Sequence, residues 1–313
     1  MDLPVKDKKY MIFSLAKANT KDGRPFLKMV LADDDRKLFN SIMYDSNRLS
    51  FEPKKGDVVS VSGTFQQFNN QPQLKVNEMF FVSVNGSEMF LPKSKNDPKE
   101  MADELRRTLQ ENISSTYFQN LLRVFYDDVE SWELFQRVPA GKNVHHAYVY
   151  GLLEHTLAAV RLAVHISSLY MEVNKELLII GALFHDIGKV RELDVAAGFE
   201  YSNAGRLHGH IVIGYLMLND YIKRVEDFPE TVRQQLLHMV LSHHGQLEFG
   251  SPQLPKTAEA LLLSFIDDLD AKLNTFSSVL GKEEVLQGGW SSYNRLLERH
   301  IYRPPEEKEQ KEE

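Results

Sequence analysis

Residues 1–91 consist of short apolar runs separated by turn residues, a pattern typical of β-strands. Turns are predicted where glycine, proline and asparagine gather, as in KDGRP at 21–25 and NNQP at 69–72. Strands are predicted over residues 10–15, 26–31, 58–61, 65–68 and 74–76. Several short strands with a glycine in the later part suit a small closed barrel.

The pattern changes after residues 92–99, a polar linker bracketed by prolines. Apolar residues then recur at helical spacing, beginning with Met101, Leu105 and Leu109. The strongest helices are predicted over residues 152–169, 177–185, 211–222, 232–241 and 258–273. We therefore expect an α+β chain of two domains, a small β-barrel followed by an all-α bundle. The apolar helical surface around 101–135 packs either within the domain or between subunits, which leaves a homo-oligomer open.

The chain has no cysteine, which excludes disulfides, zinc–thiolate sites, iron–sulfur clusters and a cysteine nucleophile. Its first residues form no signal-peptide core, and no run approaches the roughly 18 apolar residues of a membrane span. We expect a soluble, cytoplasmic protein without membrane contact.

The net charge of −7 argues against a generic cationic nucleic-acid binder, but the charge is unevenly distributed. Residues 1–95 hold 15 basic and 11 acidic residues, whereas the remainder is acidic. Part of that acidity lies in residues 304–313, PPEEKEQKEE, which we expect to be a disordered tail. This distribution is compatible with a barrel that grips an anionic strand beside an acidic metal-binding domain.

A predicted apolar helix in GALFHDIGK runs directly into His185 and Asp186, and Gly188 then ends it. Imidazole and carboxylate without sulfur suit a divalent cation such as Mn²⁺, Mg²⁺ or Fe²⁺. The alternative is that the His-Asp pair only caps the helix.

Two further residues weigh against a simple cap. His155 lies on the face of the predicted helix 152–169, and Asp267 lies in an apolar helix where an unpaired carboxylate is costly to bury. Asp268 and Asp270 compete with Asp267 for the same role. His165, His238 and His300 have ordinary structural interpretations, whereas His208 is left open.

The order His155, His185-Asp186, Asp267 resembles the HD superfamily of phosphohydrolases, which are helical proteins that hold one or two divalent metals. His210, in HIVIG, and the pair His243-His244, in LSHHG, look like the additional ligands of two-metal members. This resemblance covers about residues 140–280.

A closer resemblance, to the YhaM family, rests on KNVHHAYVYGLLEHT, FHDIGK, YSNAGRLHGHIVIG and LSHHGQLEFGSPQLPKTAEALLLSFIDDLDAKL. It implies an OB-fold over 1–91, a linker and connecting helices over 92–135, and an HD domain over 136–303. It also implies Mn²⁺-stimulated 3′→5′ removal of nucleotides from single-stranded RNA, with single-stranded DNA as a further substrate and Mg²⁺, Co²⁺ or Fe²⁺ as alternative metals.

Related two-metal sites imply one ion held by His155, His185 and Asp267 and another held by three more histidines. Those three are His210, His243 and His244. Asp186 is the natural bridge, because a carboxylate can offer one oxygen to each ion. Hydroxide would then attack phosphorus in line and the 3′-oxygen would leave.

Three further residues are candidates for contact with the substrate near the metals. Lys189 could contact the scissile phosphate as a point charge, or it could be a solvated lysine. His145 and His146 could contact the phosphate or protonate the leaving group, or they could be structural.

In the barrel, aromatic rings would stack on bases while basic residues contact phosphates. The candidates are Phe13, Phe26, Phe65 and Phe68 for stacking, Lys28 and Lys75 for phosphates, and Arg206, with His208, near the metal site. The alternative for each barrel residue is a place in the core.

Two other functions compete with the exonuclease. One is a phosphohydrolase of nucleotides, cyclic dinucleotides or alarmones, although such an enzyme needs no strand-binding barrel. The other is a non-catalytic single-strand or replication-origin DNA-binding protein with a structural metal, although such a site seldom needs two open metals.

Overall fold

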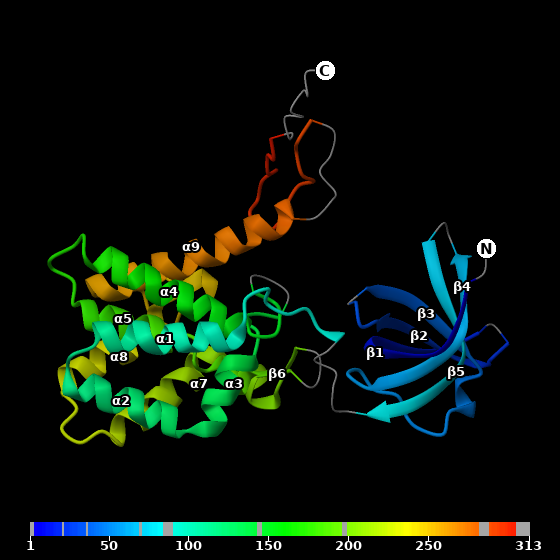
Figure 1. Cartoon of the computed structure of the whole chain (residues 1–313), viewed down its shortest axis with the longest axis horizontal. Coiled ribbons are helices and arrows are strands. Elements are labelled where there is room, and N and C mark those ends of the chain that lie inside the picture. Colours follow the sequence, from blue (N-terminus) through cyan, green and yellow to red (C-terminus); the bar gives the residue numbers. More distant parts are fainter. Residues whose placement is uncertain are drawn as a thin grey trace.

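The computed structural model describes residues 3–20, 22–35, 37–68, 71–83, 90–142, 146–195, 199–281 and 288–304. A β-barrel and a larger helical part lie beside each other (Figure 1). The α+β architecture expected from the sequence is confirmed. Residue His145 and residues 305–313 of the expected tail lie outside the described residues.

The barrel closes in the strand order β1-β2-β3-β5-β4, and β4 pairs back with β1. Only β3 and β5 run parallel, while the other neighbouring strands are antiparallel. Its strands are β1 (Leu3–Asn19), β2 (Pro25–Ala32), β3 (Leu38–Tyr44), β4 (Val58–Phe68) and β5 (Gln71–Ser83). This is the five-stranded barrel of an OB-fold.

Two details of the barrel differ from the predicted strands. Residues 58–61 and 65–68 belong to the single strand β4, and β3 had not been predicted. Alternate residues point inward, so that Ile12, Leu27, Val61 and Leu74 are fully buried in the barrel core. Phe65 packs against this core.

The helical part contains a central pair, α4 and α5, that is surrounded by the remaining helices. Its helices are α1 (Pro98–Asn112), α2 (Thr116–Asp127), α3 (Val129–Arg137), α4 (Gly151–Ser167), α5 (Lys175–Phe184), α6 (Lys189–Glu192), α7 (Asn203–Lys223), α8 (Glu230–Ser242) and α9 (Ala258–Leu280). A hairpin of β6 (Leu193–Asp194) and β7 (Glu200–Tyr201) lies between α6 and α7, and short 3₁₀ turns occupy Ser46–Arg48 and Leu247–Phe249.

Polar residues at helix ends explain where several helices begin. Asp97, in the linker, accepts hydrogen bonds from the backbone N–H groups of Lys99 and Glu100, and Pro98 is the first residue of α1. Asn174 caps α5 and Thr257 caps α9 in the same way. The linker therefore ends in a helix start signal.

The apolar face of residues 101–135 packs within the chain. Leu105, Phe118, Phe125 and Phe135 are fully buried in the same core as α4 and α5. This apolar surface is therefore part of the domain core.

The barrel contacts the helical part directly. Met11, Ala32 and Val58 belong to the helical core cluster, and Phe13 packs against it. Lys55, between β3 and β4, forms an ion pair with Glu200 of β7. Among the described helices, none has the length and apolar character needed to cross a membrane.

Candidate metal centre

Five helices deliver histidine and aspartate side chains to one buried place. From Leu177 to Phe184, helix α5 is apolar on all sides and buried, so its end lies deep in the domain and carries His185 and Asp186 there. The other side chains come from α4, α7, α9 and the end of α8. They are His155, His210, Asp267, His243 and His244.

One group surrounds the Nε2 atom of His155. This atom lies 3.0 Å from Nε2 of His185 and 3.2 Å from Oδ1 of Asp267. Two nitrogens that each lie about 2.1 Å from one ion, at right angles, would be about 3 Å apart. The spacing therefore fits a shared divalent cation.

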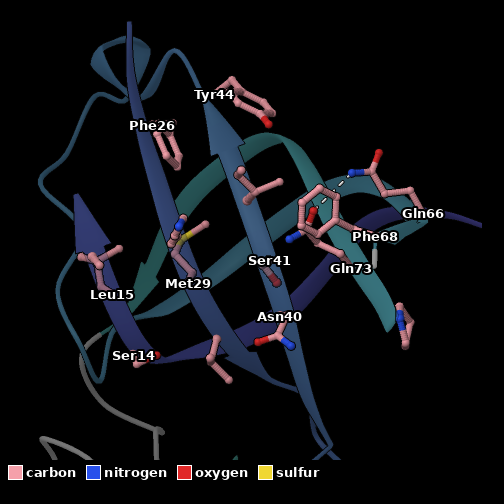
Figure 2. A pocket seen from close by; sticks show the side chains of 15 residues that line it. Ser14, Leu15, Phe26, Met29, Asn40, Ser41, Tyr44, Gln66, Phe68 and Gln73 are labelled. Atoms are coloured by element: carbon pink, nitrogen blue, oxygen red, sulfur yellow. Dashed lines mark hydrogen bonds between the residues drawn. The ribbon is translucent and has the colours of Figure 1, made fainter. Parts of the chain in front are cut away.

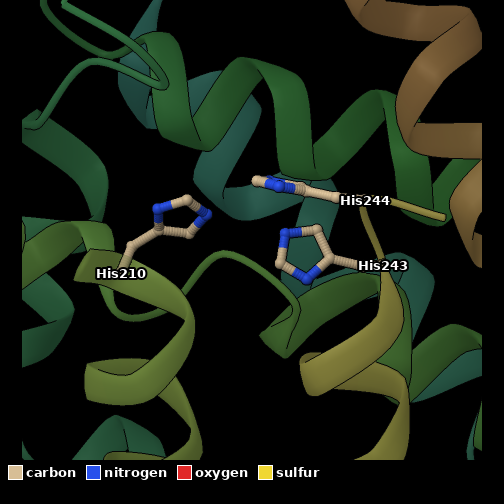
Figure 3. Close-up of side chains that lie close together, drawn as sticks. All are labelled: His210, His243 and His244. Atoms are coloured by element: carbon tan, nitrogen blue, oxygen red, sulfur yellow. The ribbon is translucent and has the colours of Figure 1, made fainter. Parts of the chain in front are cut away.

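A second group consists of His210, His243 and His244, whose facing ring nitrogens lie within 4.8 Å of one another (Figure 3). His210 projects from α7, and the two adjacent histidines follow the last turn of α8. Gly209, with φ of +70°, interrupts the helical path of α7 directly before His210. Three imidazoles so placed are a metal-ligand set without sulfur.

Asp186 lies between the two groups and faces each with a different oxygen. Oδ2 lies 3.6 Å from Nε2 of His155 and 3.4 Å from Nε2 of His185. Oδ1 lies 3.5 Å from Nε2 of His210 and 3.6 Å from Nε2 of His243. A bridging carboxylate would have this arrangement.

The outer ring nitrogens are held by acceptors, which orients the inner ones. Nδ1 of His185 donates to the carbonyl of Ala182, and Nδ1 of His243 donates to that of Val240. His244 donates in the same way to Phe249. Since a carbonyl only accepts, each neutral ring keeps a lone pair on Nε2, as a metal ligand requires.

Several polar atoms that face the space between the two groups lack hydrogen-bond partners among the described residues, as expected for a metal site. Oδ1 of Asp186, Nε2 of His210 and Nε2 of His243 are buried without a hydrogen-bond partner among the described residues. Buried polar atoms are ordinarily paired, so three that converge indicate a ligand. A divalent cation fits this donor set.

The protonation of these groups also suits a cation. Burial lowers the pKa of His243 and of His244, which favours neutral rings. Burial raises the pKa of Asp186, but the charge of Lys189, with the imidazoles of His185 and His243 beside it, outweighs burial and holds the pKa well below its ordinary value. For His155, burial lowers the pKa, but hydrogen bonds with aspartates raise it to about 10, so a cation binding there releases a proton.

Comparisons with known proteins agree with this geometry. A family model of the HD domain matches residues 152–272. The 3′-5′ exoribonuclease YhaM of Bacillus subtilis (strain 168) is 31% identical over 308 residues, which cover 95% of this chain and 94% of that protein. The chain belongs to the YhaM family. As a member with an HD domain, it is a hydrolase.

One solved structure matches part of the chain. It is the second OB-fold domain of replication protein A from Methanococcus maripaludis, with 22% identity and a TM-score of 0.20. The match covers 24% of this chain and 80% of that one.

In this YhaM family member, Lys189 lies at the candidate metal centre and His146 lies beside it. Nζ of Lys189 is buried and donates to Oδ2 of Asp186 at 2.5 Å. His146 is also buried, and its Nε2 lies 2.8 Å from Oδ2 of Asp270. The structure therefore places Lys189 next to the atoms that would bind metal. It does not place the ring of His146 there.

The three aspartates of α9 have separate surroundings. Asp267 faces the first group, whereas Asp268 is exposed and pairs with Lys272 at 2.7 Å. Asp270 accepts a hydrogen bond from Nδ1 of His155 at 2.7 Å. Asp270, which the sequence offers as an alternative to Asp267, instead supports the ligand His155; its i, i+3 spacing places it one turn from Asp267 on the same face of α9.

Glu192, at the end of α6, is a supporting residue that the sequence analysis does not name. Its Oε1 accepts from the backbone N–H of His210 at 2.9 Å and lies 3.2 Å from Nδ1 of the same ring. Asp270 and Glu192 thus hold the Nδ1 atoms of His155 and His210. Backbone carbonyl groups hold the Nδ1 atoms of the other three histidines.

Asp270→Asn is expected to weaken divalent metal binding by about 10- to 100-fold, because an amide is a poorer acceptor for the Nδ1–H of His155. The dissociation constant of Mn²⁺, measured by electron paramagnetic resonance, tests this. Asp268→Asn is the matched control on the same helix and should leave the constant unchanged. Equal Mn²⁺ affinity in the two variants would contradict the positioning role of Asp270.

Gly188 allows α6 and α7 to approach closely behind the metal centre. A Cβ atom at Gly188 would lie 2.0 Å from the carbonyl oxygen of His210 and 2.5 Å from the backbone nitrogen of Gly214. Both contacts are with backbone atoms, so an alanine would have to push α7, and His210 with it, away from α6.

Gly188→Ala is therefore expected to destabilise the protein by about 2 kcal/mol or more. Thermal unfolding followed by circular dichroism measures the change, and Gly281→Ala is the control because its nearest contact would be an ordinary 3.4 Å. A melting temperature equal to that of the control variant would show that the close approach is not obligatory.

The barrel carries a groove on one face, and it contains only part of the predicted binding set (Figure 2). Phe26, Lys28 and Phe68 line it, together with Tyr44, whose ring centroid lies 5.8 Å from that of Phe26. The three other barrel candidates do not line it: Phe13 packs at the domain boundary, Phe65 packs on the barrel core and Lys75 is exposed elsewhere. Arg206 lies in the first turn of α7.

Proposed function

We propose that this protein is a two-metal 3′→5′ exoribonuclease that releases nucleoside 5′-monophosphates from single-stranded RNA. The observation that carries the proposal is the position of Asp186, whose two oxygens face two separate groups of imidazoles. The 3′-5′ exoribonuclease activity of the Bacillus subtilis relative supports the substrate and the polarity. A cytoplasmic location stays a prediction from the cysteine-free sequence.

Each of the two groups of side chains is proposed to bind one metal ion. His155, His185 and Asp267 would hold one ion, and Asp186 would be shared. The second ion would be held by His210, His243 and His244. When bound, the two cations activate water for attack on phosphorus and offset the charge that develops on the phosphoryl oxygens. We propose Mn²⁺ as the metal, with Mg²⁺, Co²⁺ and Fe²⁺ as alternatives.

The chain's own residues would orient the phosphate and the ligands. The ammonium of Lys189 is buried beside the shared carboxylate, so it can donate to a non-bridging oxygen of the scissile phosphate. The ring of His146 contacts Asp270, and we propose that it supports the ligand His155 through that carboxylate.

The groove of the barrel is the proposed site for the strand upstream of the cleaved end. Tyr44 and Phe68 are 46% and 56% exposed, so their rings are available for stacking, and Lys28 adds a positive charge. Base stacking is tolerant of sequence and sugar, so the same groove would accept single-stranded DNA.

The double substitution Tyr44→Ala with Phe68→Ala is expected to raise the KM for a long single strand by about 10-fold or more, since each stacked base contributes roughly 1–3 kcal/mol. Steady-state hydrolysis of a long RNA and of a dinucleotide measures the effect, and the dinucleotide should be unaffected. Tyr170→Ala, which removes an exposed ring from the loop after α4, is the control. A KM unchanged for the long strand would place RNA binding elsewhere.

The proposed function itself is tested with a panel of substrates in Mn²⁺. Single-stranded RNA carrying a 5′ label should shorten from its 3′ end and release 5′-monophosphates, identified by mass spectrometry. Intact RNA together with hydrolysis of a nucleotide or a cyclic dinucleotide would establish the small-molecule alternative. Strand binding without hydrolysis of any substrate would establish a non-catalytic binding protein.

A further inference from the structure

Three cationic side chains from different parts of the chain surround one carboxylate at the domain boundary. The carboxylate is Glu200 of β7, which pairs with Lys55 through Oε1 and with Lys142, at 2.7 Å, through Oε2. Arg206 approaches Oε2 at 3.6 Å. Lys55 belongs to the barrel, Lys142 to the segment before α4, and Arg206 to the start of α7.

The cluster carries more positive charge than an ion pair that only joins the two domains would need. Three cations meet a single carboxylate, which leaves two positive charges uncompensated among these four side chains in a chain whose net charge is −7. Burial raises the pKa of Glu200, but the two lysines outweigh it and lower the pKa to about 2. The cluster is therefore a locally positive place that favours anions.

The cationic side chains remain accessible to a ligand. Those of Lys55 and Lys142 are 30% and 26% exposed, and that of Arg206 is 64% exposed. Lys55 also lies over the ring of Phe13, and Lys142 lies over the ring of Tyr201, which is 40% exposed. Cations interleaved with aromatic rings are typical of single-strand binding sites.

The cluster is connected along the chain to both of the sites already described. Arg206 precedes the ligand His210 by four residues in α7, and Lys55 follows β3 of the barrel, the strand that contributes Tyr44 to the groove. A strand that passes from the barrel to the metal centre would bring its backbone phosphates past this cluster.

We propose that Lys55, Lys142 and Arg206 form a binding site for backbone phosphates of the RNA strand between the barrel and the metal centre. This inference rests on the proposed function, because it assigns a path to the same substrate. Glu200 holds the cations together in the free protein, and a phosphodiester takes its place on them when the strand binds.

The proposal gives substitutions at the two sides of the ion pair opposite effects on RNA binding. Lys55→Gln removes a phosphate contact, so affinity falls by about 3- to 5-fold, and the slope of log affinity against log salt falls by about 0.7. Glu200→Gln removes the competing anion, so affinity rises and the slope steepens. Lys223→Gln, about 25 Å along α7 in another ion pair, changes neither quantity.

The experiment measures fluorescence anisotropy of a phosphorothioate single-stranded RNA of about 20 nucleotides, which resists hydrolysis, on the full-length Mn²⁺-loaded protein at several salt concentrations. Opposite shifts for Lys55→Gln and Glu200→Gln support the site. Shifts in the same direction, or none, overturn it and leave the cluster as a clamp between domains.

Hydrolysis of unmodified RNA by the wild-type protein is measured in parallel, which separates the two proposals. Hydrolysis without the opposite binding shifts overturns the phosphate site alone. The opposite shifts without hydrolysis overturn the exonuclease and retain the phosphate site. Lys55→Gln removes an ion pair between the domains and could lower RNA affinity for that reason alone. Glu200→Gln removes the same ion pair, but a phosphate site predicts that it raises RNA affinity, so this variant keeps the test decisive.

Discussion

Asp186→Asn is expected to lower the rate of RNA hydrolysis by about 1,000-fold or more, the largest effect of any single substitution considered for this protein. Asparagine keeps the size of the side chain, so packing at the buried end of α5 is preserved. It has only one oxygen and no charge, whereas the two oxygens of Asp186 face two different groups of histidines. The substitution therefore removes the one group that both halves of the centre share.

The measurement is kcat on single-stranded RNA, together with the number of Mn²⁺ ions bound per chain. Asp220→Asn, an exposed carboxylate paired with Lys223 on α7, is the control and should retain wild-type values for both. If Asp186→Asn kept more than a tenth of the wild-type kcat, the shared carboxylate could not be central to the reaction.

Removal of metal by a chelator is expected to abolish hydrolysis and to lower the melting temperature. Among the described residues, three buried polar atoms converge without hydrogen-bond partners, so a bound cation would satisfy them and stabilise the folded chain. A ligand at 100 times its dissociation constant adds about 2.7 kcal/mol, which corresponds to roughly 5–10 °C for a domain of this size.

Differential scanning calorimetry of the chelated and Mn²⁺-loaded protein measures the shift. The double variant His210→Gln with His243→Gln is the matched comparison. It removes two ligands of the second group and should reduce the change in melting temperature caused by Mn²⁺. An identical melting temperature with and without Mn²⁺ would indicate that the converging atoms do not bind a cation in the folded protein.

Residue type and helical context in the sequence pointed to His155, His185, Asp186 and Asp267, whereas His210, His243 and His244 followed from the resemblance to two-metal HD proteins. An apolar helix that ends in His185-Asp186 must be buried, and its charged end needs partners from other helices. The supporting residues Asp270 and Glu192 depend on which ring nitrogen faces which neighbour, and this follows only from the packing of α9 and α6 against the histidines.

In the barrel, the sequence pattern likewise predicted most strands but not every strand or the direction of each side chain. Apolar alternation predicted β1, β2 and β5, but the polar pair Asn40-Ser41 inside β3 concealed that strand. Phe65 and Phe68 lie three residues apart in β4 and therefore point to opposite faces, so one packs on the core and the other lines the groove. Aromatic character alone does not distinguish those two positions.

The most direct test of the two-metal centre is a titration of metal-stripped protein with Mn²⁺, in which bound ions and RNA hydrolysis are recorded in the same samples. We expect hydrolysis to be absent without metal and to reach its maximum only when two ions are bound per chain. Full hydrolysis at one ion per chain, or hydrolysis in the metal-stripped protein, would contradict it.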